Sequence, residues 1–477
     1  MATNDERQPS RRGSSTWRPY GSSSSIRRLV LLAGVAVLIG FAGYWLYRWK
    51  QRNRFEENLA LMEELQTANV LGNLVPRNDL NAPDDWPQWR GPRRDGVSWE
   101  RGLVDWDWPD EGPKKLWEAE TGVGYSTVAV AAGRVITIFQ DGADEAVVCW
   151  NAETGKEQWR YHYAARYVNG FGSGPRSTPT IDGDRVYTVG ATGIFHCMNA
   201  ATGERIWRHD LLEEFGANNL NWGVSFSPLI EGNLVLTNPG GRDGKSVVAF
   251  DKLKGEVAWK SFDDTASYSS PIAITAAGRR QVIFFTGSYV VGIDPVDGTS
   301  LWKYPWKNST DVNAATPIAF SARTGDVQSD YVFVSCNYGK GCCLLKLTAT
   351  AEGIVPQRVY ESTRMRNHFS SSVCLGTYLY GFDDNMLACM DLRTGEISWK
   401  QRGFDKGSLT IVAPKLIILG EHGRLAVAEA TPDEYREIAS FQFSESKCWS
   451  VPVVANGRLF LRDESRLACY ELWPASR

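Results

Sequence analysis

Histidine and methionine are scarce in this chain, which has five of the first and six of the second in 477 residues. So few His side chains leave little material for a metal site built on imidazole ligands. The scarcity of Met contrasts with 19 Trp and 45 Gly, a balance that favours β-structure with tight turns over a helical bundle. Hydrophobic residues at 43% and charged residues at 22% exclude wholesale disorder.

Most of the chain lacks an excess of positive charge. Residues 1–54 hold ten Lys and Arg against two Asp and Glu, so the remaining 423 residues carry a net charge of −11 within a total of −3. A protein that binds nucleic acid needs a basic face to displace counterions from phosphates, and the acidic body excludes that class of function. The sequence also lacks a Cys-X-X-Cys-His haem motif, which excludes an attached cytochrome domain.

The basic N-terminal end precedes a long uncharged run. Residues 1–28 are rich in Ser, Arg and Gly and are expected to be a disordered basic tail. Leu29–Leu46 contains no charge in 18 residues and would extend about 27 Å as a helix, close to the thickness of a bilayer's hydrocarbon core. The run predicts a transmembrane helix over residues 29–47, in contact with the lipid bilayer. A cleavable signal peptide is the alternative, although bulky aromatic residues and Arg follow the run where small residues would precede a cleavage site.

The charges on the two sides of this run indicate its orientation. Six Arg precede it and four Lys or Arg follow shortly after, so the positive-inside rule favours a cytoplasmic N-terminus and a periplasmic or otherwise extracytoplasmic body. Residues 48–84 are expected to form a juxtamembrane helix and a linker, because Phe55, Leu59, Met62 and Leu65 recur at helical spacing. A helix that binds a partner protein is the alternative for this segment.

An eleven-residue pattern recurs along the rest of the chain. Each copy has Asn or Asp at its third position, Gly at its seventh and Trp at its eleventh, and the Trp residues follow one another after 48, 52, 43 and 97 residues. The polar residue and the Gly make a tight turn between two strands, because Gly adopts a positive φ freely. Four strand signals in each period of about 40–50 residues are typical of one β-propeller blade. The five copies start at Cys149, Cys197, Ala249, Gly292 and Cys389.

The ends of the repeat region predict how the propeller closes. Residues 115–117 begin a Trp strand without a blade of its own, whereas the last copy, at residues 466–470, stops before its Trp strand. Pairing these two segments completes the last blade and leaves no open sheet edge. Counting the outer strands then gives an all-β, eight-bladed β-propeller with four-stranded antiparallel blades over residues 85–477.

The repeat carries a family resemblance. Its Asn or Asp, Thr-Gly and Trp positions resemble the pyrroloquinoline quinone (PQQ) repeat of eight-bladed quinoprotein dehydrogenases and of BamB-like outer-membrane assembly proteins. Residues 85–96, Asp-Trp-Pro-Gln-Trp-Arg-Gly-Pro-Arg-Arg-Asp-Gly, resemble the start of PQQ-like repeat proteins of planctomycete-type bacteria. The resemblance covers residues 85–472 and is specific for the fold, but propellers support many activities. It implies that the repeat Trp residues dock one blade on the next: Trp117, Trp159, Trp207, Trp259, Trp302 and Trp399.

The sequence offers little for catalytic chemistry. A quinoprotein dehydrogenase holds its quinone with calcium, which needs several oxygen ligands and a catalytic carboxylate, and no such set can be assigned here. Some quinoprotein dehydrogenases bear a disulfide between adjacent cysteines. Cys342 and Cys343 are adjacent here, but neighbouring side chains on a strand point to opposite faces, which disfavours their pairing. We therefore expect no catalytic residue, cofactor or metal, with PQQ and calcium as the alternative.

The residues that begin the innermost strand of each blade are expected to surround a central funnel. They combine aromatic rings, cations and amides, which suits a polar ligand or a peptide. The alternative is that Ser, Pro and Gly at these positions only shape the entry of each strand. The predicted ligand- or partner-binding residues are Tyr125, Arg176, Trp222, Tyr268, Asn313, Asn367, His368, Lys406 and Trp449.

Together these patterns predict a membrane-anchored, non-catalytic binding or scaffold protein of the bacterial cell envelope. Its expected partners are envelope proteins or peptides, and the resemblance implies a part in outer-membrane protein assembly. A PQQ-dependent dehydrogenase is the alternative, and a calcium site with a catalytic Asp would distinguish it. A sensor is a third alternative, but a 28-residue tail leaves no room for a signalling domain.

Overall fold

The long N-terminal helix is the first element of the chain. The computed structural model describes residues 23–73, 84–100, 103, 106 and 108–472, and they divide into two units, Met1–Leu59 and Ala60–Arg477. Helix α1 (Ser23–Thr67) covers the run that was predicted to cross a membrane. Among the residues described, no helix is both long enough and apolar enough to span a bilayer. The predicted transmembrane helix over residues 29–47 is therefore not supported.

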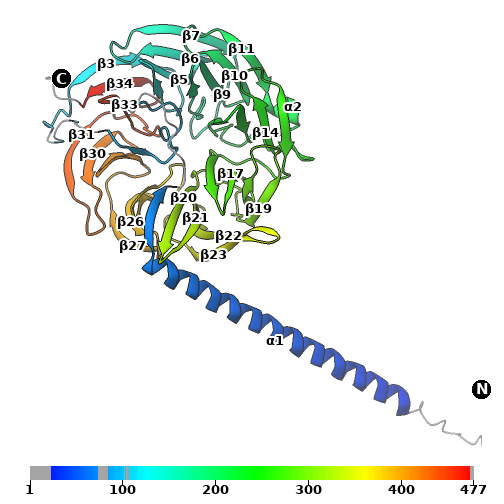
Figure 1. The fold of residues 1–477 in the computed structure, drawn as a ribbon. Coiled ribbons are helices and arrows are strands. Elements are labelled where there is room, and N and C mark those ends of the chain that lie inside the picture. The colour runs from blue at the N-terminus through cyan, green and yellow to red at the C-terminus, as the bar shows by residue number, and fades with distance from the viewer. Residues whose placement is uncertain (1–22, 74–83, 101–102, 104–105, 107, 473–477) are drawn as a thin grey trace, which may run out of the picture. The chain divides into compact units, whose positions relative to one another are not determined.

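The second unit contains eight β-sheets arranged as blades around a central channel (Figure 1). Each blade is a meander of four antiparallel strands, and two of the eight sheets have gained a fifth strand. The predicted eight-bladed β-propeller is confirmed. From the inner to the outer edge, blades one to four consist of β4 (Ala129–Ala131), β5 (Arg134–Asp141), β6 (Asp144–Asn151) and β7 (Glu157–Ala164); β8 (Thr180–Asp182), β9 (Arg185–Val189), β10 (Ile194–Asn199) and β11 (Arg205–Asp210); β12 (Leu229–Glu231), β13 (Leu234–Thr237), β14 (Val247–Asp251) and β15 (Val257–Ser261); and β16 (Ile272–Ala276), β17 (Arg279–Phe285), β18 (Tyr289–Ile293) and β19 (Ser300–Pro305).

The remaining blades continue round the ring to the point of closure. The last blade takes its outer strand from the N-terminal side, because β3 (Lys115–Glu120) pairs antiparallel with β34 (Arg466–Glu471) as the sequence predicted. A short helix, α2 (Leu211–Phe215), follows the outer strand of blade two. Blades five to eight consist of β20 (Ile318–Thr324), β21 (Val327–Cys336), β22 (Gly341–Thr350) and β23 (Gly353–Ser362); β24 (Val373–Leu375), β25 (Tyr378–Asp383), β26 (Met386–Asp391) and β27 (Glu396–Gln401); β28 (Ser408–Val412), β29 (Lys415–Leu419), β30 (Arg424–Glu429) and β31 (Glu437–Gln442); and β32 (Val453–Ala455), β33 (Arg458–Arg462), β34 and β3.

The repeat Trp of one blade packs on the hairpin turn of the next. The Trp207 ring lies so close to Gly255 that a Cβ there would stand 2.8 Å from Trp207 Cγ, and Gly255 has a φ of +77°. Trp207 Nε1 also donates to the carbonyl of Lys252 at 3.3 Å in the same turn. The turn thus needs glycine both for its backbone and for the ring beside it, which explains why the repeat couples a Gly with a Trp. Equivalent rings and turns are Trp117 with Gly155, Trp159 with Gly203, and Trp259 with Gly298.

The two remaining repeat Trp residues make different contacts. Trp399 Nε1 donates to the carbonyl of Thr431 at 2.9 Å in blade seven. Trp302 Nε1 donates to Gln281 Oε1 at 2.6 Å within its own blade. In blade five the turn between the third and fourth strands lacks the Thr-Gly pair of the repeat. In blade five the place of the Trp is taken by Tyr360, whose hydroxyl donates to the carbonyl of Leu392 at 2.8 Å.

The adjacent cysteines on β22 lie on opposite sides of blade five. Cys342 is buried in the apolar cluster between blades five and six, whereas Cys343 belongs to the cluster between blades four and five. All nine cysteines are free. The alternation of side chains along a strand therefore keeps this pair apart.

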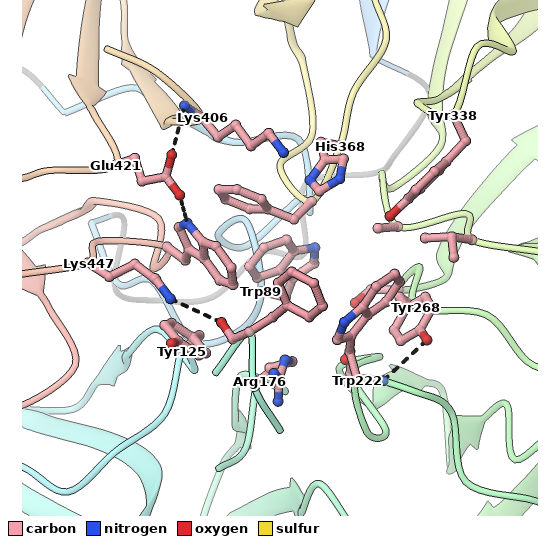
Figure 2. Close-up of a pocket in the computed structure, with 18 residues that line it drawn as sticks. Trp89, Tyr125, Arg176, Trp222, Tyr268, Tyr338, His368, Lys406, Glu421 and Lys447 are labelled. Carbon is pink, nitrogen blue, oxygen red and sulfur yellow. Dashed lines mark hydrogen bonds between the residues drawn. The ribbon is translucent and has the colours of Figure 1, made fainter. Parts of the chain in front are cut away.

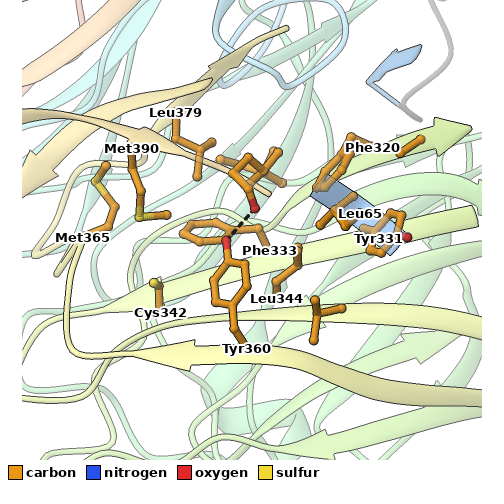
Figure 3. Close-up of a cluster of buried hydrophobic side chains, with 14 of the residues drawn as sticks. Leu65, Phe320, Tyr331, Phe333, Cys342, Leu344, Tyr360, Met365, Leu379 and Met390 are labelled. Atoms are coloured by element: carbon orange, nitrogen blue, oxygen red, sulfur yellow. Dashed lines mark hydrogen bonds between the residues drawn. The ribbon is translucent and has the colours of Figure 1, made fainter. Parts of the chain in front are cut away.

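Blade five carries an addition that the sequence did not predict. β1 (Asn69–Asn73) pairs antiparallel with β20 and becomes a fifth strand, in a region that was expected to belong to a juxtamembrane helix and a linker. Leu65 at the end of α1 is fully buried in the cluster that contains Phe320 and Tyr331 (Figure 3). Glu64 binds Lys346 Nζ through both carboxylate oxygens at 2.7 Å. The end of α1 and β1 are thus integral parts of the propeller's core.

Residues 84–100, here called the plug, lie against the inner strands of the propeller and contact all eight blades. They include the short strand β2 (Val97–Ser98), which pairs in parallel with β28. The Arg94 guanidinium is buried and reaches two blades, and burial lowers its pKa to about 9. In blade order the contacts join Trp86 to Val130, Pro87 to Ile181, Arg94 to Pro228, Arg94 to Pro271, Trp89 to Thr316, Arg90 to Ser372, Gly96 to Ile411 and Glu100 to Gly457.

The last plug contact makes stability dependent on pH. Glu100 is 6% exposed, and burial raises its pKa from 4.5 to about 7, against the opposing hydrogen bond from the backbone N–H of Gly457. Asp84 adds to the increase and Arg458 opposes it. Because the folded pKa exceeds the unfolded one, the folded state takes up a proton between these values. The free energy of unfolding therefore falls as the pH rises from about 4.5 to about 7, in total by about 3 kcal/mol.

The variant Glu100→Gln tests this pH dependence. It keeps the oxygen that accepts from Gly457 at 2.7 Å but cannot ionise. We expect it to exceed the parent in stability by up to about 3 kcal/mol at pH 8 and to match it near pH 4.5. Urea unfolding at both pH values measures the difference. An equal difference at the two pH values would contradict the raised pKa.

Candidate functional site

A cavity of about 600 Å³ opens at the centre of the propeller, next to the plug. Its walls come from segments that precede the inner strands and from two hairpin loops, at Tyr338 and at Glu421. Trp89 of the plug also lines it, and lies in the middle of Figure 2. The plug contacts every blade and its Trp89 side chain lines the cavity, so the plug forms one wall of the cavity.

The structure brings seven of the nine predicted binding residues together around this cavity. They come from the loops before the inner strands of seven different blades, so residues up to 324 positions apart in the sequence share one site. As binding residues they remain a prediction. The seven are Tyr125, Arg176, Trp222, Tyr268, His368, Lys406 and Trp449.

Asn313 and Asn367 do not line the cavity, contrary to the prediction. Both are buried, and their side-chain amides hold neighbouring backbone. Asn313 Nδ2 donates to the carbonyl of Thr286 at 2.7 Å, and Asn367 Nδ2 donates to the carbonyl of Phe382 at 3.0 Å. Their role in the structure is to fix the loops that carry the lining residues beside them.

Several lining residues were not predicted. Phe369 adjoins the predicted His368 in the sequence, and Lys447 lies two residues before Trp449, so a wider window around each predicted position would have included them. Tyr338 and Glu421 lie between the second and third strands of their blades, a position that was not considered. Trp89 and Phe171 lie in the plug and in the long loop before β8.

Aromatic rings form much of the cavity wall. The Trp449 ring lies between Tyr125 and Phe369, with centroid distances of 4.9 and 5.0 Å. On the other side, Trp222 packs against Tyr268 at 5.4 Å. Such rings offer large, rigid apolar faces and can stack with a ring of a ligand.

Three cations lie among these rings. Arg176 donates to the carbonyls of Gly174 and Gly172 at 2.7 and 2.6 Å, and burial lowers its pKa. Lys447 Nζ donates to the carbonyl of Phe171 at 3.0 Å and lies 4.5 Å from the centroid of the Trp449 ring. The Lys406 ammonium makes no ion pair with any residue that the structure describes.

The single carboxylate that lines the cavity is already engaged. Glu421 accepts hydrogen bonds from Trp449 Nε1 at 2.9 Å and from the backbone N–H of Lys406 at 3.4 Å (Figure 2). Burial, and then the charge of Lys406, lower the pKa of His368, so its imidazole is neutral at pH 7. No described side chain forms a hydrogen bond with His368 Nδ1. The lining residues therefore hold no paired nucleophile and base of the kind that acyl or phosphoryl transfer needs.

The side chains that line the cavity do not fit the calcium ion that accompanies PQQ. Calcium takes six to eight oxygen ligands, mostly carboxylates and carbonyls, whereas Glu421 is the one carboxylate on the cavity wall. Across the described ranges, no three His, Cys, Asp or Glu side chains gather closely enough to hold a metal ion. The donor set at this cavity is cationic and aromatic, which suits an anion and not a cation.

Comparison with known proteins adds to this geometry. A family model described as "Outer membrane protein assembly factor BamB" matches residues 143–401, more than half of the chain. A relative of that name from Shewanella oneidensis is 24% identical over 287 residues, which cover 58% of this chain and 67% of the relative. Another from Yersinia pestis is 23% identical over 296 residues, covering 60% and 71%.

The propeller also resembles a solved structure. The quinohemoprotein alcohol dehydrogenase from Comamonas testosteroni superposes with a TM-score of 0.62 and 11% sequence identity, covering 88% of this chain and 85% of that one. At such low identity the likeness shows the shared fold alone.

Proposed function

The chain belongs to the family of the outer membrane protein assembly factor BamB, and from this membership we propose that it is a non-catalytic binding protein of the bacterial cell envelope. In this role it takes part in the assembly of outer-membrane proteins, and its central cavity captures a segment of a partner protein. The two relatives are both called outer membrane protein assembly factors, which supports a part in the assembly of outer-membrane proteins.

The observation that carries the proposal is the composition of the cavity's walls. Aromatic rings and cations line it, and the plug forms one of its walls. Phe171 at the cavity is 67% exposed, which places a large apolar side chain at the surface. Exposed apolar side chains beside a cavity lined by aromatic rings are typical of protein-binding surfaces.

A gene deletion in the source bacterium tests the proposal. We expect the deletion to lower the amount of folded outer-membrane proteins, because a scaffold for their assembly is lost. Folded and unfolded forms can be separated by electrophoresis without heating. Restoring the full chain should restore the folded forms. Unchanged outer-membrane proteins in the deletion strain would overturn the proposal, and reduction of a dye by the purified chain with alcohol, PQQ and calcium would favour the dehydrogenase alternative.

A further inference from the structure

We propose that the central cavity binds an acidic loop segment of a partner protein, in which at least two Asp or Glu side chains flank an aromatic side chain. The existence of a protein partner rests on the proposed function, whereas the chemistry of the segment comes from the cavity itself.

The charges of the cavity wall call for an anion. Arg176, Lys406 and Lys447 face one carboxylate, Glu421, and that carboxylate accepts two hydrogen bonds from the wall. The nearest further acid is Glu464, which lies 4.0 Å from Lys447 Nζ and accepts a hydrogen bond from Tyr125. The lining residues thus keep an excess of positive charge in an otherwise acidic protein. Such a local potential attracts and orients an anionic ligand.

Arg176 is the clearest sign of a missing anion. Its guanidinium is held by two glycine carbonyls and lies over the rings of Tyr125 and Tyr167, at 5.4 and 5.5 Å from their centroids. No described carboxylate forms an ion pair with it. A partly buried cation without a counterion is costly in free energy, and a ligand carboxylate would offset that cost with charge-assisted hydrogen bonds.

The placement of the cations indicates more than one acidic group. Arg176 precedes β8, Lys406 precedes β28 and Lys447 precedes β32, so the three belong to blades two, seven and eight. Figure 2 shows Arg176 and Lys406 on opposite sides of the cavity. A segment with two acidic side chains can place one carboxylate beside each of these cations. A segment with several acidic side chains matches this arrangement better than a lone C-terminal carboxylate.

The aromatic wall and the exposed rim indicate a polypeptide with an aromatic side chain. The rings around Trp449 and the pair Trp222 and Tyr268 supply aromatic faces inside the cavity, where an aromatic ring of a ligand can stack. The loop before β8 exposes Val168 by 64% and Phe171, which lines the cavity, by 67%. Exposed apolar surface at the edge of the cavity can contact a partner polypeptide that is longer than the cavity. Because the plug forms one wall of the cavity, a loop that enters and returns on the side away from the plug fits it.

Defined peptides test the proposal with the full-length chain. The probe is acetyl-Gly-Asp-Tyr-Asp-Gly-amide, and calorimetry and quenching of Trp fluorescence measure its binding. We expect the affinity to fall at least tenfold when both Asp are replaced by Asn, to fall when Tyr is replaced by Ala, and to weaken with added salt. Equal binding of the Asn peptide would overturn the proposal. Tighter binding of Gly-Ser-Gly-Tyr with a free C-terminal carboxylate would overturn the choice of a loop segment.

Variants connect the binding to the cavity. Arg176→Gln and Lys406→Gln should each weaken binding of the acidic peptide at least fivefold, whereas Lys254→Gln, at an exposed hairpin turn, is the matched control and should leave binding unchanged. Lys406 makes no ion pair in the described part of the chain, so its variant should melt like the parent and report on binding alone. Equal effects of Lys406→Gln and Lys254→Gln would overturn the site.

The two proposals can fail separately. Loss of peptide binding in these variants with normal outer-membrane proteins in the deletion strain would overturn the proposed function and leave the site intact. Defective outer-membrane proteins without any peptide binding would overturn the acidic segment alone.

Discussion

A chain that begins at residue 121 is expected to aggregate or to melt far below a chain that begins at residue 84. The shorter chain lacks β3, which pairs with β34 in the last blade. Its loss leaves the backbone of β34 unpaired along an exposed edge, which promotes association with other chains. The same truncation removes the buried Trp117 ring, a loss worth about 3–5 kcal/mol by itself. Together these losses approach the whole free energy of unfolding of an ordinary domain.

A third chain, which begins at residue 108, separates the plug from the closing strand. It keeps β3 and lacks every plug contact, so we expect it to fold with a reduced melting temperature and without aggregation. Thermal melting and light scattering of the three chains measure both effects. If the chains that begin at residues 84 and 121 melt alike, closure of the ring by β3 does not stabilise the protein.

The second large effect is expected for Trp207→Ala. Trp207 is 9% exposed and packs at 5.0 Å from the Phe195 ring, with the turn at Gly255 on its other side. Removing the indole leaves a cavity between blades two and three and an unused carbonyl at Lys252. The expected loss of stability is about 3–5 kcal/mol.

The matched control for this variant is Trp99→Ala. Trp99 is 54% exposed and contacts the Arg93 guanidinium at 5.5 Å, so its removal should cost less than about 1 kcal/mol. Denaturant unfolding of both variants provides the comparison. A similar loss in the two would mean that the repeat Trp does not hold adjacent blades together.

Most of the fold could be predicted because its blades share a sequence pattern that repeats along the chain. The Gly and Trp of each copy perform one physical task, a turn that receives the ring of the preceding blade, and therefore recur at a readable spacing. The plug and β1 occur once, so no repetition in the sequence indicates how residues 84–100 or 69–73 fold. Their structure depends on partners such as Ser372 and Arg323, which are hundreds of positions away.

At the candidate site, the sequence pattern does not predict which individual residues line the cavity. Each predicted residue was taken from the entry to an inner strand, and at two blades the choice was wrong by one position. Val312 and Ala314 line the cavity while Asn313 between them points away, and His368 lines it while Asn367 does not. Around Asn313 successive side chains face opposite ways, as in extended chain, so a shift of one residue exchanges cavity for core. The sequence pattern identified the segments but not this register.

The plug also constrains how such a propeller can evolve. Repeat proteins grow and shrink by duplication or loss of whole units, and a ring of blades can in principle gain one or lose one in this way. Here one segment of 17 residues reaches every blade with a different contact, from Trp86 on blade one to Glu100 on blade eight. A ring of seven or nine blades would have a channel of another width, in which Arg90 and Arg94 no longer meet their carbonyls at 2.7 and 2.9 Å. The number of blades can therefore change only together with the plug, because the contacts of the plug fit a ring of eight blades.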